Sequence, residues 1–404
     1  MTSLISIIMP CYNRAHDLRH TLHAYDTQTY SDPFEVIAID DASTDGTYDI
    51  LVQHQPKRYS LQVVRQDCNQ GPASARNRGI QLAQAPLIAF VGDDIMPTSN
   101  FVNSHLAAHK QYPQLEVAIL GKVAWPQDMP VNMLMRHIDG VGAQQFSYHF
   151  FKNHEEYDFR QFYTANISVK ASFLQRANSL FDTSFPYAAF EDAEFAYRLA
   201  NHGLRIIYDD RPVGYHYHYH TFWTFAKRQY RAGLMACRVV EKHPELASLL
   251  RVKKTRHLFV LRLLHRVNDS SVEALSKTAH WLEQQALYMG SSFEWQPHDL
   301  LDEFYLRVLE YHWRQGLIAG VFGDTTYAKV ISYAYAVYYL GDFFRDFIPR
   351  AQQANVPVSM GSMEELNVKL ALVESGIVKY LRKFWQAYGY RLTKEWLYTD
   401  QVPT

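Results

Sequence analysis

The most constraining feature of this 404-residue chain is a series of short apolar runs in its first 120 residues, separated by helical patterns. The runs predict five strands, at 4–9, 34–39, 61–64, 87–91 and 117–121. They are nearly continuous in Val, Ile and Leu, which is typical of strands buried on both faces of a parallel sheet. We therefore expect an α/β fold with a doubly wound, mostly parallel sheet. Such sheets bind ligands at the carboxyl ends of their strands.

Polar residues directly follow three of these strands. Pro10–Arg14 follows the first strand, Asp40-Asp41 the second and Gly92-Asp93-Asp94 the fourth, so we expect them along one rim of the sheet. Two adjacent carboxylates repel each other, which favours a cation nearby. Oxygen ligands suit Mg²⁺ or Mn²⁺ bridging a diphosphate. The alternative for each acid pair is structural, such as a cap on the following helix.

Two later groups also carry chemistry. Glu191-Asp192 opens a predicted helix over 190–201, where the helix dipole favours acids in any case. A strand predicted over 213–220 would place His216, His218 and His220 on one face. His216 and His220 would lie about 13 Å apart, too far for all three to hold one metal, whereas one histidine or an i, i+2 pair is able to. The alternative is a stacked face of aromatic and imidazole rings.

Composition excludes several classes of protein. The 40 basic and 41 acidic side chains give a net charge of −1, so no nucleic-acid partner is expected. The three cysteines show neither a disulfide framework nor a metal knuckle. GxGxxG after the first strand, GxxxxGK[ST], HExxH and GxSxG are absent. With no apolar run of about 18 residues and no signal-peptide pattern, we expect a cytoplasmic protein without membrane spans.

Six ordered blocks resemble those of the family-two glycosyltransferases. They are SIIMPCYNR at 6–14, IDDASTDGT at 39–47, NQGPASARNRG at 69–79, FVGDDIMP at 90–97, TANIS at 164–168 and FEDAEFAYRL at 190–199. The resemblance implies a Rossmann-like GT-A fold and an inverting, metal-assisted enzyme with a nucleotide-sugar donor, most commonly UDP-linked. The acceptor would be a hydroxyl of a glycan or a lipid-linked molecule. The QxxRW motif of the processive members is absent, which favours non-processive transfer.

The resemblance also implies roles for individual residues. The donor would contact Pro10, Tyr12, Arg14, Asp41, Arg76 and Asp93. Asp94 would hold Mn²⁺ or Mg²⁺ together with His216 or His218, and Gly92 stands where the family's metal motif usually has its first Asp. Asp192 would be the general base, with Glu191 and Asn166 orienting the acceptor or the donor sugar.

After Thr221 the pattern changes to long helices. We expect a catalytic domain over 1–221 and an all-α domain over 222–404. Within it, residues 227–266 carry eleven basic and two acidic side chains, 11 − 2 = +9. This basic segment predicts that the protein binds peripherally to the inner face of an anionic membrane. The alternative is that the basic side chains form the solvated face of a packed helix. The remaining helices of the all-α domain are rich in aromatic residues, which predict a core, with an acceptor groove or a homo-oligomer contact as alternatives.

Two rival functions remain open from the sequence. One is sugar transfer to a polyprenyl phosphate or a protein side chain. The other is a catalytically silent module that binds a nucleotide sugar or a glycan, with Gly92 marking a decayed metal site. Release of nucleoside diphosphate separates an enzyme from a silent module.

Overall fold

The computed structural model describes residues 3–141, 146, 148–250, 252, 269–291, 298–356 and 363–373. Contacts between residues divide the chain into two compact units, Met1–Tyr219 and His220–Thr404. The expected boundary after residue 221 lies two residues beyond this division.

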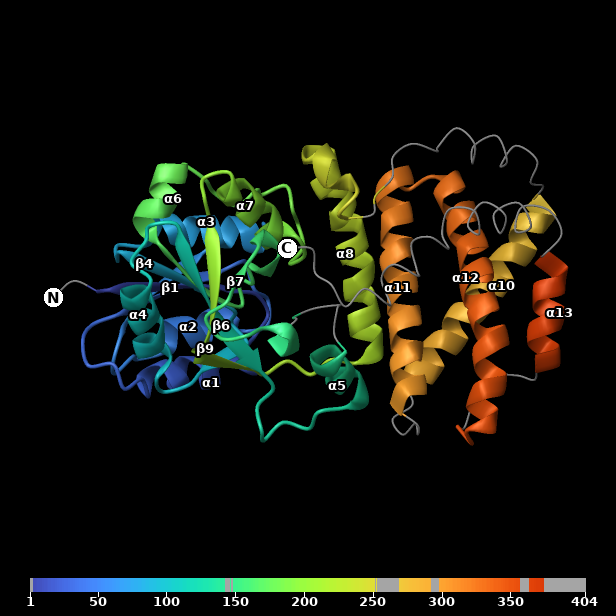
Figure 1. Cartoon of the computed structure of the whole chain (residues 1–404), viewed down its shortest axis with the longest axis horizontal. Coiled ribbons are helices and arrows are strands. Elements are labelled where there is room, and N and C mark those ends of the chain that lie inside the picture. Colours follow the sequence, from blue (N-terminus) through green and yellow to red (C-terminus); the bar gives the residue numbers. More distant parts are fainter. Residues whose placement is uncertain are drawn as a thin grey trace. The chain divides into compact units, whose positions relative to one another are not determined.

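The first unit contains a sheet of nine strands among the described residues (Figure 1). Their order is β3-β2-β1-β4-β8-β6-β9-β5, with β7 pairing with β9. The strands are β1 (Ile5–Cys11), β2 (Glu35–Asp40), β3 (Ser60–Arg65), β4 (Leu87–Val91), β5 (Ile95–Pro97), β6 (Val117–Ala124), β7 (Glu156–Tyr157), β8 (Asn166–Lys170) and β9 (Arg205–His216). Strands β3, β2, β1 and β4 are parallel, as are β6 and β9, whereas β8 runs antiparallel between β4 and β6. The expected α/β class with a mostly parallel sheet is confirmed.

Helices flank this sheet and connect its strands (Figure 1). They are α1 (Leu18–Asp26), α2 (Thr47–Gln53), α3 (Pro72–Leu82), α4 (Phe101–Gln111), α5 (Met133–Gly140), α6 (Ala171–Ala177) and α7 (Glu191–Ala200), with 3-10 turns η1 (Tyr148–Phe150) and η2 (Phe159–Gln161). Helix α3 packs on β1 and β2. A Cβ at Gly79 of α3 would lie 2.3 Å from Ile8 Cγ2, so glycine at this position lets the helix approach the strand closely.

Strand β9 differs from the prediction. The sequence predicts a strand over 213–220, but Arg205–His216 forms one strand with a register shift against β6. The strand ends at His216, so the expectation that His216, His218 and His220 share one strand face is wrong. His220 is buried in the second unit, where its ring lies 5.2 Å from that of Phe225. The physical reason is that both neighbouring strands stop beside His216, because β6 ends at Ala124, opposite Tyr215, and β5 starts at Ile95, opposite His216.

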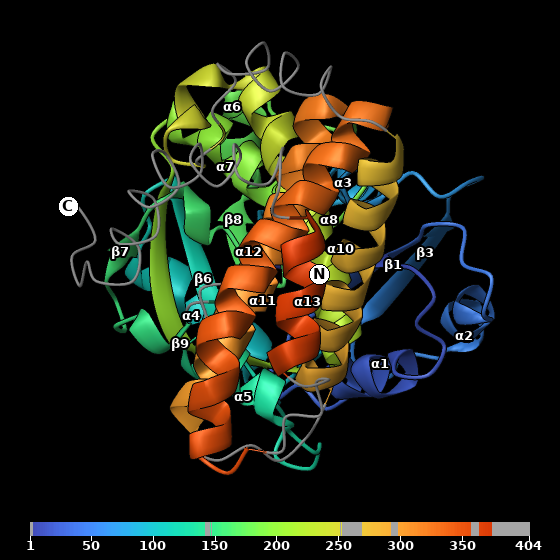
Figure 2. The same cartoon turned by 90° about the vertical axis from the view of Figure 1, so that its right-hand side faces the viewer.

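The second unit is helical in its described part, as expected (Figures 1 and 2). It contains α8 (Phe222–Lys242), η3 (Pro244–Ala247), α10 (Asp269–Gly290), α11 (His298–Phe322), α12 (Thr326–Gln353) and α13 (Met363–Val373). Helix α8 packs against α11, and α12 packs against both α10 and α11. A Cβ at Gly233 of α8 would lie 1.9 Å from the Trp313 carbonyl oxygen, and one at Gly316 of α11 would lie 1.9 Å from that of Tyr230. These two glycines allow the backbones of α8 and α11 to touch.

The basic segment is described only in part. Residues 227–250 and 252 are described, and 251 and 253–266 lie outside the described residues. On α8, Lys227, Arg231, Arg238 and Lys242 are exposed and recur at helical spacing, so they share one face. None of the helices in the described ranges combines the length and the apolar character needed to cross a bilayer.

Candidate active site

The loops that follow β1 and β2 interlock and fix the direction of Arg14. Asn13 has a left-handed backbone, φ 52°, and its side-chain oxygen accepts a hydrogen bond from the Thr44 amide at 2.8 Å. In return, Ser43 Oγ accepts from the Asn13 amide at 3.0 Å and Thr47 Oγ1 accepts from the Arg14 amide at 2.7 Å. Residues 43–45 are not among the site residues expected from the sequence. Their role in holding residues 13 and 14 was missed, because the partner lies some 30 positions earlier in the chain.

The acid pair after β4 lies against Arg14. Asp93 and Asp94 are only 8% and 9% exposed. Arg14 Nε is 3.2 Å from Asp93 Oδ1, and Arg14 Nη2 is 2.8 Å from Asp94 Oδ2. The other Asp93 oxygen accepts from the Tyr12 amide at 3.1 Å. The cation that two adjacent carboxylates require is therefore provided, in this structure, by a side chain from the end of β1.

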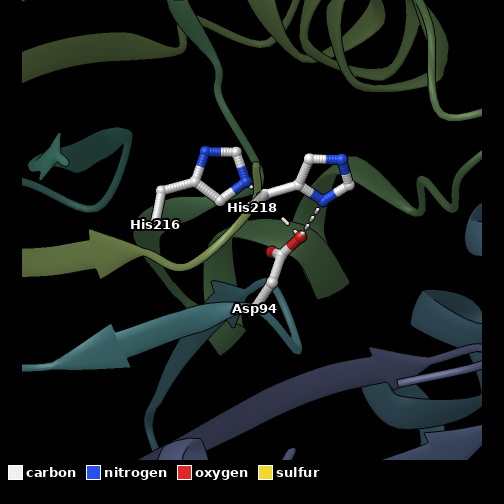
Figure 3. A group of neighbouring side chains, drawn as sticks. All are labelled: Asp94, His216 and His218. Carbon is white, nitrogen blue, oxygen red and sulfur yellow. Dashed lines mark hydrogen bonds and ion pairs between the residues drawn. The ribbon is translucent and has the colours of Figure 1, made fainter. Parts of the chain in front are cut away.

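Two histidines converge on the same Asp94 oxygen (Figure 3). His216 Nε2 is 3.4 Å and His218 Nδ1 is 3.3 Å from Asp94 Oδ2. These three ligand atoms all lie within 4.8 Å of one another, a spacing that fits a metal ion. The arrangement agrees with the i, i+2 histidine pair that the sequence left open. His218 Nδ1 also lies 3.1 Å from Arg14 Nη1, so the guanidinium borders the ligand group.

Pairing and stacking hold His216 in place. Its backbone is paired with Ile95 in the antiparallel β5–β9 ladder, one residue after Asp94. Trp125 stacks on the imidazole, with ring centroids 5.3 Å apart and planes inclined by 11°. The Tyr217 amide donates to the Asp94 carbonyl oxygen at 2.9 Å, which keeps the chain beside Asp94 as far as His218. Trp125, which directly follows β6, was not recognised from the sequence.

Burial and charge move the pKa values of the two acids apart. Burial raises the pKa of Asp93 to about 7, and the neighbouring Asp94 carboxylate adds to the rise while Arg14 opposes it. Burial acts on Asp94 as well, but His216, His218 and Arg14 outweigh it and hold the pKa of Asp94 well below its usual range. Asp94 is therefore the carboxylate that stays ionised, as a metal ligand must be.

A second group of charged residues lies at the start of α7. Arg76 of α3 is 7% exposed and Glu191 is 2% exposed, and Arg76 Nη1 lies 2.8 Å from Glu191 Oε1. Next to this buried pair, Asp192 is partly exposed. Burial raises the pKa of Asp192 to about 7, with Glu191 adding to the rise and Arg76 opposing it. A carboxylate with this pKa is suited to accept a proton near neutral pH.

The other residues that we selected are dispersed. Asp41, expected to face a nucleotide base, accepts from Gln66 Nε2 and from the Gln70 and Gly71 amides at 2.5, 2.7 and 2.8 Å, and so holds the start of α3. Pro10 lies in the β1–β2 ladder, and Tyr12 is 47% exposed. Asn166, expected to orient a sugar, is fully buried within the sheet and its amide is taken up by protein groups. Asn166 pairs with Val91 at the end of β4, next to the rim, and its side-chain amide points to backbone carbonyl groups of β6 and β9.

The protein thus has an α/β core with carboxylates, an arginine side chain and two histidines gathered at one edge of its sheet. Residues 6–181 match the family model described as glycosyl transferase family 2.

Two curated relatives illustrate the similarity. The chain is 30% identical over 232 residues to validoxylamine A glucosyltransferase of Streptomyces hygroscopicus subsp. jinggangensis, covering 50% of this chain and 52% of that protein. It is 28% identical over 150 residues to UDP-Glc:alpha-D-GlcNAc-diphosphoundecaprenol beta-1,3-glucosyltransferase WfgD of Escherichia coli, covering 35% of this chain and 58% of that protein. The chain thus spans little more than half the length of these relatives.

Two solved structures also match this chain. Mannosyltransferase PcManGT from Pyrobaculum calidifontis, in complex with GDP-Man and Mn²⁺, matches with a TM-score of 0.49 at 15% identity, over 80% of this chain and 89% of that one. TarS 1-349 of S. aureus in complex with UDP matches with a TM-score of 0.44 at 16% identity, over 80% of this chain and 92% of that one.

Proposed function

We propose that this protein is an inverting, non-processive glycosyltransferase. It moves a sugar from a nucleotide-sugar donor, UDP-linked as in the name of the E. coli relative, to a hydroxyl of a glycan or lipid-linked acceptor. The observation that carries the proposal is the convergence of Arg14, Asp93, Asp94, His216 and His218 at one rim of a family 2 domain. A carboxylate, two imidazoles and a guanidinium at one place suit a diphosphate with its metal.

A divalent metal fits the ligand group. Asp94, His216 and His218 would hold it, and it would neutralise the charge that develops on the leaving nucleoside diphosphate. Mg²⁺ favours an all-oxygen shell that keeps several waters, so two imidazole nitrogens favour Mn²⁺ over Mg²⁺. Arg14, already paired with Asp93 beside these ligands, contributes a second positive charge on the donor side. Pro10, Tyr12, Asp41 and Arg76 remain our proposal for the nucleotide pocket.

Asp192 supplies the base. Inversion in a single displacement needs one base at the acceptor hydroxyl rather than the two carboxylates of a retaining enzyme. The acceptor oxygen forms its bond to the anomeric carbon as the bond to the diphosphate oxygen breaks, and Asp192 takes the hydroxyl proton. The Arg76–Glu191 pair supports this step by fixing the first turn of α7 and by setting the charge beside Asp192.

Asp192→Asn tests the base. An amide cannot accept the proton, so turnover should fall by at least about a hundredfold, the low end of what a general base contributes. Donor binding, followed by thermal shift with nucleotide sugars and Mn²⁺, should change little because binding stabilises by mass action. Full activity of Asp192→Asn would refute the assignment. Donor binding without release of nucleoside diphosphate by the unmodified protein would favour the silent module instead.

Asp94→Ala tests the metal. This variant should lose turnover, because the carboxylate oxygen that His216 and His218 share is removed. Any residual turnover should no longer respond to EDTA. Asp210→Ala is a matched control, since Asp210 is an exposed acid on β9. It should keep the activity and the EDTA response of the unmodified protein. An EDTA response that persists in Asp94→Ala would argue against this ligand.

A further inference from the structure

We propose that Asn166 is a positioning residue that fixes the register of β9 and thereby brings His216 to Asp94. The importance of this register for function rests on the metal site proposed above. The register itself is argued from the sheet alone.

Strand β9 changes its register at one point. Gly121 of β6 pairs with Asp209, but the next residue, Lys122, pairs with Val213, so residues 210–212 leave the ladder. Beyond the shift, His216 pairs with Ile95 of β5. Side chains alternate between the two faces of a sheet, so a slip by one residue would turn His216 away from Asp94. Whatever holds the shift therefore decides which β9 side chain faces Asp94.

Asn166 of β8 binds both strands at this point. Its Nδ2 donates to the Lys122 carbonyl oxygen at 3.0 Å and to the Pro212 carbonyl oxygen at 2.8 Å. Lys122 lies on β6 just after the shift, and Pro212 is the last residue outside the ladder. One amide group thus binds a carbonyl group on each of the two strands at the register shift.

Gly121 makes room for this contact. A Cβ at position 121 would lie 2.4 Å from Asn166 Nδ2 and 2.6 Å from the Pro212 carbonyl oxygen. Both distances are too short for a real side chain, so the strand requires glycine at this position. The geometry of β6 is thus adapted to the Asn166 amide.

A chain of side chains fixes the orientation of the Asn166 amide. His105 Nε2 lies 2.9 Å from Asn166 Oδ1, and His105 Nδ1 lies 2.8 Å from Ser168 Oγ. Ser168 Oγ lies 2.9 Å from His109 Nε2, and His109 Nδ1 lies 3.1 Å from Lys170 Nζ. With Lys170 donating, one assignment makes every contact a hydrogen bond. His109 Nε2 donates to Ser168, the Ser168 hydroxyl donates to His105, and His105 Nε2 donates to Asn166 Oδ1. Asn166 Nδ2 then points to the two carbonyl groups.

Mn²⁺ affinity is the first readout. In Asn166→Ala the shift loses its two hydrogen bonds, His216 is no longer held at Asp94, and Mn²⁺ affinity measured by electron paramagnetic resonance should fall at least about tenfold. Asn77→Ala is the matched control. The Asn77 side chain also makes two hydrogen bonds to backbone, both to Phe181, but does not touch β9. It should leave Mn²⁺ affinity unchanged.

A disulfide cross-link reads the register without any metal. Met96 and Tyr215 are partners in the β5–β9 ladder and neither is a proposed ligand. Cysteines placed at both positions, with the exposed Cys68 changed to Ser, should cross-link readily in the native register, because opposed Cα atoms in an antiparallel pair are about 4.5–5.5 Å apart. Adding Asn166→Ala should reduce the yield severalfold.

The two readouts separate the possible failures. An unchanged cross-link, or unchanged Mn²⁺ affinity in Asn166→Ala, would overturn the positioning role. If the protein with native Asn166 binds no Mn²⁺, the proposed metal site fails and the cross-link alone decides the register. Should Asn166→Ala not fold, Gly121→Ala presses one methyl group against the same amide and is expected to change both readouts in the same direction.

Discussion

Arg14 is the residue at which the elements of the site meet. Its amide is held by Thr47 after β2, and its guanidinium contacts Asp93, Asp94 and His218. From the sequence we expected Arg14 and Asp93 to contact the donor and Asp94 to hold a metal. The structure shows them as one charged group, with the guanidinium beside the ligand atoms that a metal would use.

Replacing Arg14 should therefore change metal and nucleotide binding in opposite directions. In Arg14→Gln, Mn²⁺ affinity without nucleotide should rise about tenfold, roughly 1.4 kcal/mol, because a positive charge 2.8 Å from Asp94 Oδ2 no longer competes. Affinity for a nucleoside diphosphate should fall. Isothermal titration calorimetry measures both. Arg65→Gln, which removes a guanidinium 3.3 Å from Asp40, is the control and should change neither. Weaker Mn²⁺ binding in Arg14→Gln would contradict the competition.

Glu191 should set the pH dependence of Asp192. Because the pKa of Asp192 is raised to about 7, its carboxyl is protonated and unable to accept a proton below this pH, so kcat/KM should rise with pH through about 7. Glu191→Gln removes the adjacent negative charge and leaves the positive charge of Arg76. The pKa of Asp192 then falls, and the rising limb should move about one pH unit lower.

A neighbouring glutamate provides the control for this profile. Glu194 lies in the same first turn of α7 but pairs with Arg198 at 2.8 Å. Glu194→Gln should leave the pH dependence of kcat/KM where it is. If the rise of kcat/KM with pH stays at the same pH in Glu191→Gln, Glu191 does not set the pKa of Asp192.

At the scale of elements, close approach of backbones explains several glycines. Gly79 lets α3 lie against Ile8, and Gly233 and Gly316 let α8 and α11 touch. A helical pattern in the sequence does not reveal such crossings, because a glycine within a helix has the same appearance whether it faces solvent or another backbone. The strands β1, β2 and β4 were predicted to within two residues, since continuous apolar runs leave little choice.

Gly233→Ala should destabilise the helical unit. The added Cβ would meet the Trp313 carbonyl group, and overpacking of this kind lowers the free energy of unfolding by about 1–3 kcal/mol. Hydrogen–deuterium exchange in peptides from α8 and α11 should increase. Gly140→Ala on α5 is the control, because no atom lies within 4 Å of its added Cβ, and it should be neutral or slightly stabilising. Unchanged exchange in Gly233→Ala would show that α8 and α11 do not need this contact.

At the scale of the whole molecule, a net charge of −1 conceals an uneven distribution. The basic segment 227–266 carries +9, which leaves −10 for the rest of the chain. Asp93 and Asp94 at the rim, and Glu191 and Asp192 at the start of α7, contribute to that negative charge. The described part of the basic segment presents Lys227 and Arg238 on an exposed face of α8.

We expect the full chain to float with anionic liposomes at low salt and to be released by salt, since each basic residue near such a surface contributes about 1 kcal/mol. Lys227→Glu combined with Arg238→Glu should reduce the bound fraction severalfold. Neutral liposomes, and a variant with Lys277→Glu on α10, are the controls. Absence of binding to anionic liposomes would leave the basic segment as a solvated face.

The sequence by itself determined the class of fold, the strand ends that carry polar side chains and the six blocks that resemble family-two glycosyltransferases. These follow from local properties of the sequence, namely the apolar runs, the polar residues that directly follow them and the six ordered blocks. Only the tertiary structure decided that Arg14 balances the acid pair, that Asn166 lies at a bulge and that His216 and His218 meet at one Asp94 oxygen. Such contacts join residues 46 to 124 positions apart. Their geometry depends on strand register, which the local sequence pattern does not encode.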